Sequence, residues 1–359
     1  LPTSDMISLL FFSLVAVVVG TSDELLSVSV VIRHAERPGQ SGWATPQSPQ
    51  VFFRGNGQLS DQGIDNACEQ GKEFRKRYVK SGFIDKRFLP SEVYVRSSAV
   101  NRCLMSAASF SSALFRETSK DHAVIPPIYT KDQKDDGLLV PLLSCSDGWD
   151  DVIARFNLTS SVNVQQQALM KMLTTMWPEG CSGVPPTLID AIVSELPNKL
   201  IKMPANYRAC VEGPAKPLIY DYAEIGAGAG NNFNELRIKR VAGLLTNELL
   251  TSFAAVANCS TVPCPGQPKM RIYYTHDTNV VAIAHVFGVL DSFHNVAPEF
   301  SSALVFEIRR NANGAYVKIF LKDGHKADFV DTNNCASDCS LSAVTAAASP
   351  LAITSQIPC

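Results

Sequence analysis

One short segment of the chain combines a histidine with two arginines in a pattern suited to phosphoryl transfer. Residues 33–38 read Arg-His-Ala-Glu-Arg-Pro. Guanidinium groups are planar donors that match a phosphate dianion. A neutral imidazole can attack phosphorus directly if its other nitrogen donates to a carbonyl group. The pattern predicts a phosphohistidine intermediate on His34, with Arg33 and Arg37 binding the phosphate.

Further candidate groups occur at two other places in the chain. The segment Thr275-His276-Asp277 offers a second imidazole to hold the transferring oxygens and a carboxyl group to protonate the leaving alkoxide. A carboxyl group carries its proton more often at low pH, so we predict an acidic optimum. Arg96 supplies a third guanidinium for the phosphate.

These groups all follow predicted strands, over residues 26–32, 93–95 and 270–274, which are rich in β-branched and aromatic residues. Ligands of open α/β sheets bind beyond the carboxyl ends of the strands, so we expect the groups to converge there. Ser97 and Ser98 have the side chains of helix caps and predict a helix over residues 100–114.

The alternation of strands and helices predicts an α/β fold with a largely parallel sheet and helices on both faces. Residues 303–308 and 316–321 are expected to form a hairpin. Residues 146–230 show helical patterns broken by Pro and Gly, which indicates a helical lobe inserted into an α/β catalytic domain of residues 23–145 and 231–359.

The N-terminal residues and the cysteines favour a secretory destination. Residues 7–19 are apolar and end in small residues, so residues 1–22 are interpreted as a signal peptide with upstream residues. Ten cysteines form an even set, as in disulfide-bonded proteins. The pairs predicted from spacing are Cys259–Cys264, Cys335–Cys339 and Cys145–Cys359, while Cys68, Cys103, Cys181 and Cys210 stay unassigned. Asn157 and Asn258 begin glycosylation sequons.

Composition argues against several other classes of protein. The formal net charge of -2 provides no general field for nucleic acid, and no segment after residue 22 is apolar enough for a stable membrane anchor. Zinc-hydrolase histidine spacing and the Gly-x-Ser-x-Gly motif of serine esterases are both missing from the sequence. The glycine-rich residues 226–230 lack the preceding strand of a nucleotide loop and are interpreted as a hinge.

With these motifs together, the chain resembles the histidine acid phosphatases, the secreted and lysosomal branch of the histidine phosphatase superfamily, which includes the prostatic and lysosomal acid phosphatases. The likeness extends from about residue 28 to the C-terminus. Besides residues 33–38 and 275–278, it includes residues 57–63, 74–78, 95–98 and 102–106, and the late Cys335 and Cys339. Ala35 stands where the family usually has glycine.

The resemblance implies an acid phosphatase that hydrolyses phosphate monoesters without a metal or other cofactor. It implies that His34 is the nucleophile, that Asp277 is the proton donor, and that the phosphoryl group is bound by Arg33, Arg37, Arg96 and His276. The expected partners are small-molecule or protein phosphomonoesters, and many members form homodimers. A secreted, lysosomal or extracellular location is expected. Two alternatives remain open: a secreted binding protein without catalytic activity, and a specialised phosphatase such as a phytase.

Overall fold

The structure, a computed structural model, describes residues 23–116, 124, 126–140, 148–159, 163–332 and 339–357. The predicted signal peptide lies outside the described residues. So do both members of the predicted Cys145–Cys359 pair and one member of the predicted Cys335–Cys339 pair.

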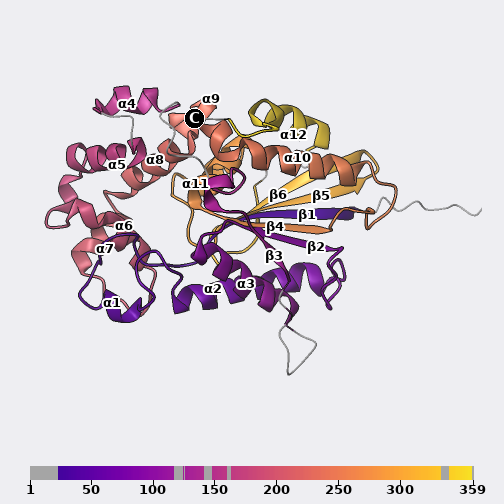
Figure 1. Ribbon diagram of the computed structural model, residues 1–359, viewed down its shortest axis with the longest axis horizontal. Helices are drawn as coiled ribbons and strands as arrows, with labels where there is room; N and C mark the ends of the chain where they lie inside the picture. The colour runs from indigo at the N-terminus through magenta and orange to yellow at the C-terminus, as the bar shows by residue number, and fades with distance from the viewer. Residues whose placement is uncertain are drawn as a thin grey trace, which may run out of the picture.

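A seven-stranded mixed sheet forms the centre of the α/β part (Figure 1). The strands lie in the order β3-β2-β4-β1-β5-β6-β7. Their bounds are β1 Glu24–Arg33, β2 Val93–Ser97, β3 Ile128–Tyr129, β4 Met270–Thr275, β5 Ala303–Asn311, β6 Gly314–Lys322 and β7 Val330–Asp331.

Strands β3, β2, β4 and β1 are parallel to one another, and this half of the sheet confirms the expected strand arrangement. The other half is antiparallel because β5 and β6 form the predicted hairpin, with β5 against β1. Arg33 is in register with Thr275, and Ser97 with Tyr274. The segments that follow β1, β2 and β4 therefore begin at the same edge of the sheet.

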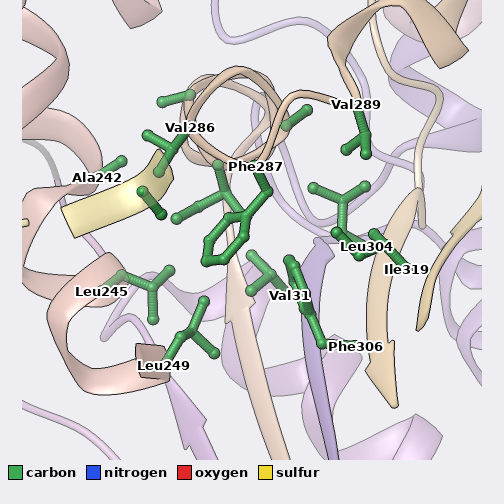
Figure 2. Close-up of a cluster of buried hydrophobic side chains, with 14 of the residues drawn as sticks. Val31, Ala242, Leu245, Leu249, Val286, Phe287, Val289, Leu304, Phe306 and Ile319 are labelled. Atoms are coloured by element: carbon green, nitrogen blue, oxygen red, sulfur yellow. The ribbon is translucent and has the colours of Figure 1, made fainter. Parts of the chain in front are cut away.

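Side-chain alternation along these strands creates two separate cores. Val28, Val30 and Ile32 of β1 point to the face covered by α2 and α3. Val31 points to the opposite face, where it packs with Leu245 and Leu249 of α10 and with residues at the end of α11 (Figure 2). The strands are thus buried on both faces, as their nearly continuous apolar sequences predict.

Helices lie on both faces of the sheet, as expected (Figure 1). Their bounds are α1 Ser48–Val51, α2 Asp61–Phe74, α3 Asn101–Phe115, α4 Asp150–Phe156, α5 Val164–Thr175, α6 Ile189–Glu195, α7 Ala205–Glu212, α8 Lys216–Ala227, α9 Glu235–Ile238, α10 Leu244–Ala257, α11 Asp277–Val286 and α12 Leu341–Ala348. Within the described ranges, none of these helices combines the length and apolar character needed to cross a bilayer.

Helices α4 to α8 gather beside the sheet around a core of their own (Figure 1). Trp149, Met172 and Ile192 are buried in this core. A disulfide between Cys181 and Cys210, two cysteines left unassigned from the sequence, joins the segment before α6 to α7. These helices fall within residues 146–230, the segment in which the sequence indicates a helical lobe.

The remaining cysteines divide into bonded and free groups. The predicted Cys259–Cys264 disulfide is present, and Cys339 is also disulfide-bonded. Cys68 and Cys103 are free thiols, and Cys103 is fully buried.

The predicted caps at Ser97 and Ser98 were wrong. Helix α3 begins at Asn101, and its N-cap residue Val100 makes no side-chain cap bond. The Ser97 hydroxyl donates to the Ser98 carbonyl oxygen, and the Ser98 hydroxyl lies 3.3 Å from Nε2 of His276. The strand therefore ends two residues later than predicted, and Ser98 contacts a candidate site residue instead of a helix end.

Candidate active site

His34 and His276 lie next to each other at the ends of two neighbouring parallel strands. The backbone N–H of His34 donates to the carbonyl oxygen of Thr275 over 3.0 Å. The two imidazole rings are 5.6 Å apart between centroids and meet edge to face at 70°. Parallel pairing of β1 with β4 thus brings together two histidines that are far apart in the sequence.

The surroundings of His34 keep its imidazole neutral. Its Nδ1 lies 2.9 Å from the Ala35 carbonyl oxygen, which can only accept, so Nδ1 carries the proton and Nε2 keeps its lone pair. Burial, with the positive charges of Arg102 and Arg33, lowers the pKa of His34 well below its usual value. The side chain is only 1% exposed. The ring therefore has the tautomer and charge of a nucleophile.

Arg33 spans the gap between the two strand ends. One of its terminal nitrogens is 2.7 Å from Oδ2 of Asp277, and the other donates to the Pro298 carbonyl oxygen over 2.5 Å. Its guanidinium lies 4.3 Å from the centroid of the Phe300 ring, which is also 5.8 Å from the His34 ring. An aromatic face beneath a guanidinium holds it in position and favours its charge.

Arg37 reaches from the loop after β1 to the helical lobe. Its guanidinium donates to the Pro38 carbonyl oxygen over 2.8 Å and to the Ser194 hydroxyl over 3.2 Å. The Asp190 carboxylate is 3.4 Å away, and both lobe residues belong to α6. The side chain of Arg37 is buried, and this contact joins the predicted phosphate-binding loop to α6.

Arg102 is a charged site residue to which the sequence analysis assigned no role. It lies near the start of α3, and one of its terminal nitrogens is 3.4 Å from Nδ1 of His276. Arginine can only donate, so Nδ1 of His276 accepts and Nε2 carries the proton, directed toward Ser98. Burial and then the Arg102 charge lower the pKa of His276 to about 4. His276 is therefore neutral at pH 5.

Arg96 is not beside the histidines, which corrects the expectation that it joins them. It pairs with the buried Asp136 over 2.6 Å and donates to the carbonyl oxygens of Ser97 and Tyr129. Alternation along the strand explains this placement. Val93 and Val95 point to the core beneath α2 and α3, the side on which His34 and His276 also fall, so Arg96 points to the opposite face.

The groups around Asp277 hold it as a carboxylate. Its side chain is 38% exposed, yet it is surrounded by charged groups. Partial removal from water raises its pKa, but the positive charges of Arg33 and Arg37 and the neighbouring His276 outweigh this effect and lower the pKa of Asp277 to about 2. At mildly acidic pH this carboxyl group has no proton to give before substrate binds.

Three further residues near the site come from segments that the sequence analysis did not connect with it: Phe300, Asp190 and Tyr222. Phe300 lies in the loop before β5. Tyr222 of α8 is partly buried, and its removal from water together with the charges of Asp277 and Asp190 raises its pKa. A single sequence gives no signal for these contacts, because they depend on how the lobe packs on the sheet. Among the residues that the structure describes, no group of three His, Cys, Asp or Glu side chains is placed to hold a metal ion.

Comparisons with known proteins identify the family of the chain. The profile of the family described as "Histidine phosphatase superfamily (branch 2)" matches residues 24–147 and 216–322. A Caenorhabditis elegans relative is 26% identical over 355 residues, covering 92% of this chain and 79% of its own. Human testicular acid phosphatase is 26% identical, covering 80% of this chain and 68% of its own. Rat lysosomal acid phosphatase is 24% identical, with 83% and 71% covered.

Among solved structures, a Hafnia alvei phytase in complex with tartrate matches with a TM-score of 0.59 at 15% identity, covering 94% of this chain and 99% of its own. At that identity the likeness shows the fold alone. The matched profile covers β1 to α3 and α8 to β6, which include His34, Arg102, His276 and Asp277. The unmatched stretch between its two parts contains α4 to α7. The chain belongs to branch 2 of the histidine phosphatase superfamily.

Proposed function

We propose that this chain is an acid phosphatase that hydrolyses phosphate monoesters through a phosphorylated His34. The observation that carries the proposal is the tautomer and charge of the His34 ring. Its Nδ1 donates to the Ala35 carbonyl oxygen, so Nε2 keeps its lone pair, and no described residue forms a hydrogen bond with that nitrogen. The acid phosphatase relatives and the family support the same reaction class.

The lowered pKa of His34 gives a physical reason for activity in acid. An ordinary histidine has a pKa of about 6.5 and would be largely protonated at pH 5, so its lone pair would be lost. Burial and positive neighbours lower the pKa of His34 well below that ordinary value, which favours the neutral ring in acid. The same environment attracts an anion, so the groups that protect the nucleophile also bind its target.

Arg33, Arg37 and Arg102 are proposed to bind the phosphoryl oxygens, together with His276. Each of the three arginines has a buried Nε–H with no acceptor among the described residues. Their guanidinium groups therefore have more donors than the protein satisfies. A phosphate supplies several strong acceptor oxygens and would match this surplus. Arg96 is not proposed for this role, because the buried Asp136 holds it.

Asp277 is proposed as the proton donor, and the proton must arrive with the substrate. Phosphate monoesters have a second pKa of about 6, so at pH 5 most of them carry one proton. A bound phosphate competes for Arg33 and places negative charge near Asp277, which raises the affinity of that carboxylate for the proton. The substrate monoanion can then pass its proton to Asp277.

The reaction follows in two displacements. In the first, Nε2 of His34 attacks phosphorus, the bond to the ester oxygen breaks, and Asp277 protonates the leaving alkoxide. In the second, water attacks phosphorus, the Asp277 carboxylate takes a proton from that water, and the bond to Nε2 breaks. Asp277 then passes this proton to the departing phosphate, so the products are the alcohol and the inorganic phosphate monoanion, and Asp277 is again a carboxylate.

The chain is further proposed to enter the secretory pathway and reach a lysosomal or extracellular location. Two disulfides in the described residues, Cys181–Cys210 and Cys259–Cys264, fit an oxidising compartment. Asn157 and Asn258 are both exposed, so either could carry a glycan. The apolar run at residues 7–19 fits a signal peptide.

Release of p-nitrophenol from its phosphate ester at a pH of about 5 tests the proposal, with His34→Ala as the matched control. The wild-type protein should turn over and the variant should not. Folded wild-type protein that binds phosphate without turnover would favour the non-enzymatic binder instead. Comparison of inositol phosphates, phosphotyrosine peptides and nucleotides as substrates distinguishes a broad phosphatase from a phytase.

A further inference from the structure

The contact between Arg37 and Asp190 differs from the other ion pairs at the site. Both nitrogens that face Asp190 lie 3.4 to 3.5 Å from the same oxygen, Oδ1. Arg33 approaches Asp277 to 2.7 Å. Charge-assisted hydrogen bonds are usually 2.7–2.9 Å long. Arg37 is therefore paired with a carboxylate that it does not bind tightly.

Asp190 is nevertheless fixed close to the site. Its second oxygen accepts from the backbone N–H of Gln40 over 2.5 Å. The backbone of Gly39 approaches α6 so closely that a Cβ at that position would come within 2.6 Å of the Cα of Ala191. The negative charge of Asp190 thus stays beside the loop that carries Arg37, whether or not Arg37 turns toward a ligand.

From these contacts we propose that Asp190 is a displaceable counter-ion of Arg37 that weakens the affinity of the site for phosphate. The inference deepens the proposed function, because it assumes that phosphate binds at Arg37. His34 is only 1% exposed, so an arriving phosphate must displace some of the contacts around it. The long pair between Arg37 and Asp190 is the easiest of these ion pairs to exchange.

Ser194 provides Asp190 with a hydrogen bond that remains when Arg37 turns away. Its hydroxyl accepts from Arg37 over 3.2 Å and donates to Asp190 over 3.3 Å. When phosphate takes the guanidinium, Asp190 keeps its bonds to Ser194 and to the Gln40 N–H. The Asp190 carboxylate therefore stays beside the phosphate and repels it. The lobe thereby limits how tightly the inorganic phosphate product is held, which favours its release.

The test is calorimetric titration of the full chain with inorganic phosphate at pH 5, comparing wild type with Asp190→Asn. The amide keeps the shape and an acceptor oxygen but removes the charge. We expect the phosphate Kd to fall roughly three- to tenfold, as for loss of one half-exposed charge near an anion. The KM for p-nitrophenyl phosphate should fall in parallel. Asp190→Ser should also lower the phosphate Kd, and it replaces the amide variant in the test if that variant does not fold.

Asp221→Asn is the matched control, since Asp221 forms an ion pair with Arg155 elsewhere on the lobe. It should leave the phosphate Kd unchanged. A phosphate Kd that is unchanged or higher in both Asp190 variants would overturn the inference, and a higher value would mean that Asp190 orients Arg37 for binding. Because phosphate binding is measured without turnover, the result stands apart from the proposed function. A wild-type protein that binds phosphate but hydrolyses no monoester would contradict the proposed function and not the inference on Asp190.

Discussion

Arg33 and Asp277 form a 2.7 Å ion pair across the ends of β1 and β4. Arg33 is in register with Thr275, so the pair links a residue at the end of one strand to the first residue of the helix that follows the other. The pair lowers the pKa of Asp277 and occupies a guanidinium that phosphate is proposed to bind. Phosphate binding and the protonation of Asp277 are therefore expected to be coupled.

Asp277→Asn should separate the two displacements. An amide can neither protonate the leaving group nor accept a proton from water, and a loss of about 10²- to 10⁴-fold in kcat is expected. Nitrophenolate leaves without a proton, so with p-nitrophenyl phosphate the first displacement should survive and the second should fail. Rapid mixing should then show a burst of about one nitrophenol per site followed by slow turnover. Equal loss of both phases would contradict the assigned role.

The pH profile of kcat/KM reports the ionisation of the free enzyme. The pKa of His34 is lowered well below its usual value and that of His276 is lowered to about 4, so activity should persist below the ordinary histidine pKa of about 6.5 and decline as the pH approaches about 4. A decline centred on pH 6.5 would mean that the rings are unperturbed. Arg102→Gln removes a positive neighbour, which should raise both pKa values and move the acid limb to higher pH.

Arg96 and Arg102 should give opposite results when each is changed to alanine. Arg96→Ala leaves the Asp136 carboxylate buried without its partner, and such a loss costs about 3–5 kcal/mol of unfolding free energy. Arg102→Ala should leave stability nearly unchanged and weaken phosphate binding. Denaturant unfolding and phosphate titration of both variants check this. A large loss of phosphate affinity in a folded Arg96 variant would mean that Arg96 does bind phosphate and would contradict its assignment to a structural ion pair.

The difference between these two arginines shows how far the sequence could predict the site. Strand-end position was enough to predict that His34, Arg33, His276 and Asp277 lie close together, because parallel pairing brings such residues to one edge of the sheet. It was not enough for Arg96, since the face on which a strand residue falls depends on register and on where the strand ends. Arg102 lies on a helix, and its direction was not visible from spacing.

The contacts that the helical lobe makes with the site could not be predicted from the sequence for another reason. Asp190 and Ser194 meet Arg37 across more than 150 positions, and the packing of α6 on the loop after β1 depends on tertiary structure. The sequence could locate the helices of this segment from their periodicity. It carried no information on which of their polar residues faces the site.

The Cys181–Cys210 disulfide should stabilise the lobe. Both cysteines are buried in its core, and the bridge closes a loop with a sequence separation of 29. Replacing both by serine should lower the unfolding free energy by about 2–4 kcal/mol. Thermal unfolding of the double variant and of wild type measures the effect. An unchanged unfolding temperature would show that the bridge does not form or does not constrain the lobe.

Direct detection of the phosphorylated residue tests the central claim. Wild-type protein mixed with ³²P-labelled phosphate monoester at acidic pH and quenched in alkali should retain label that is stable in base and released by acid, as expected for a phosphoramidate. Peptide mapping should place it on His34, and His34→Ala should retain none. Label on another residue, or full turnover by the His34 variant, would contradict the mechanism.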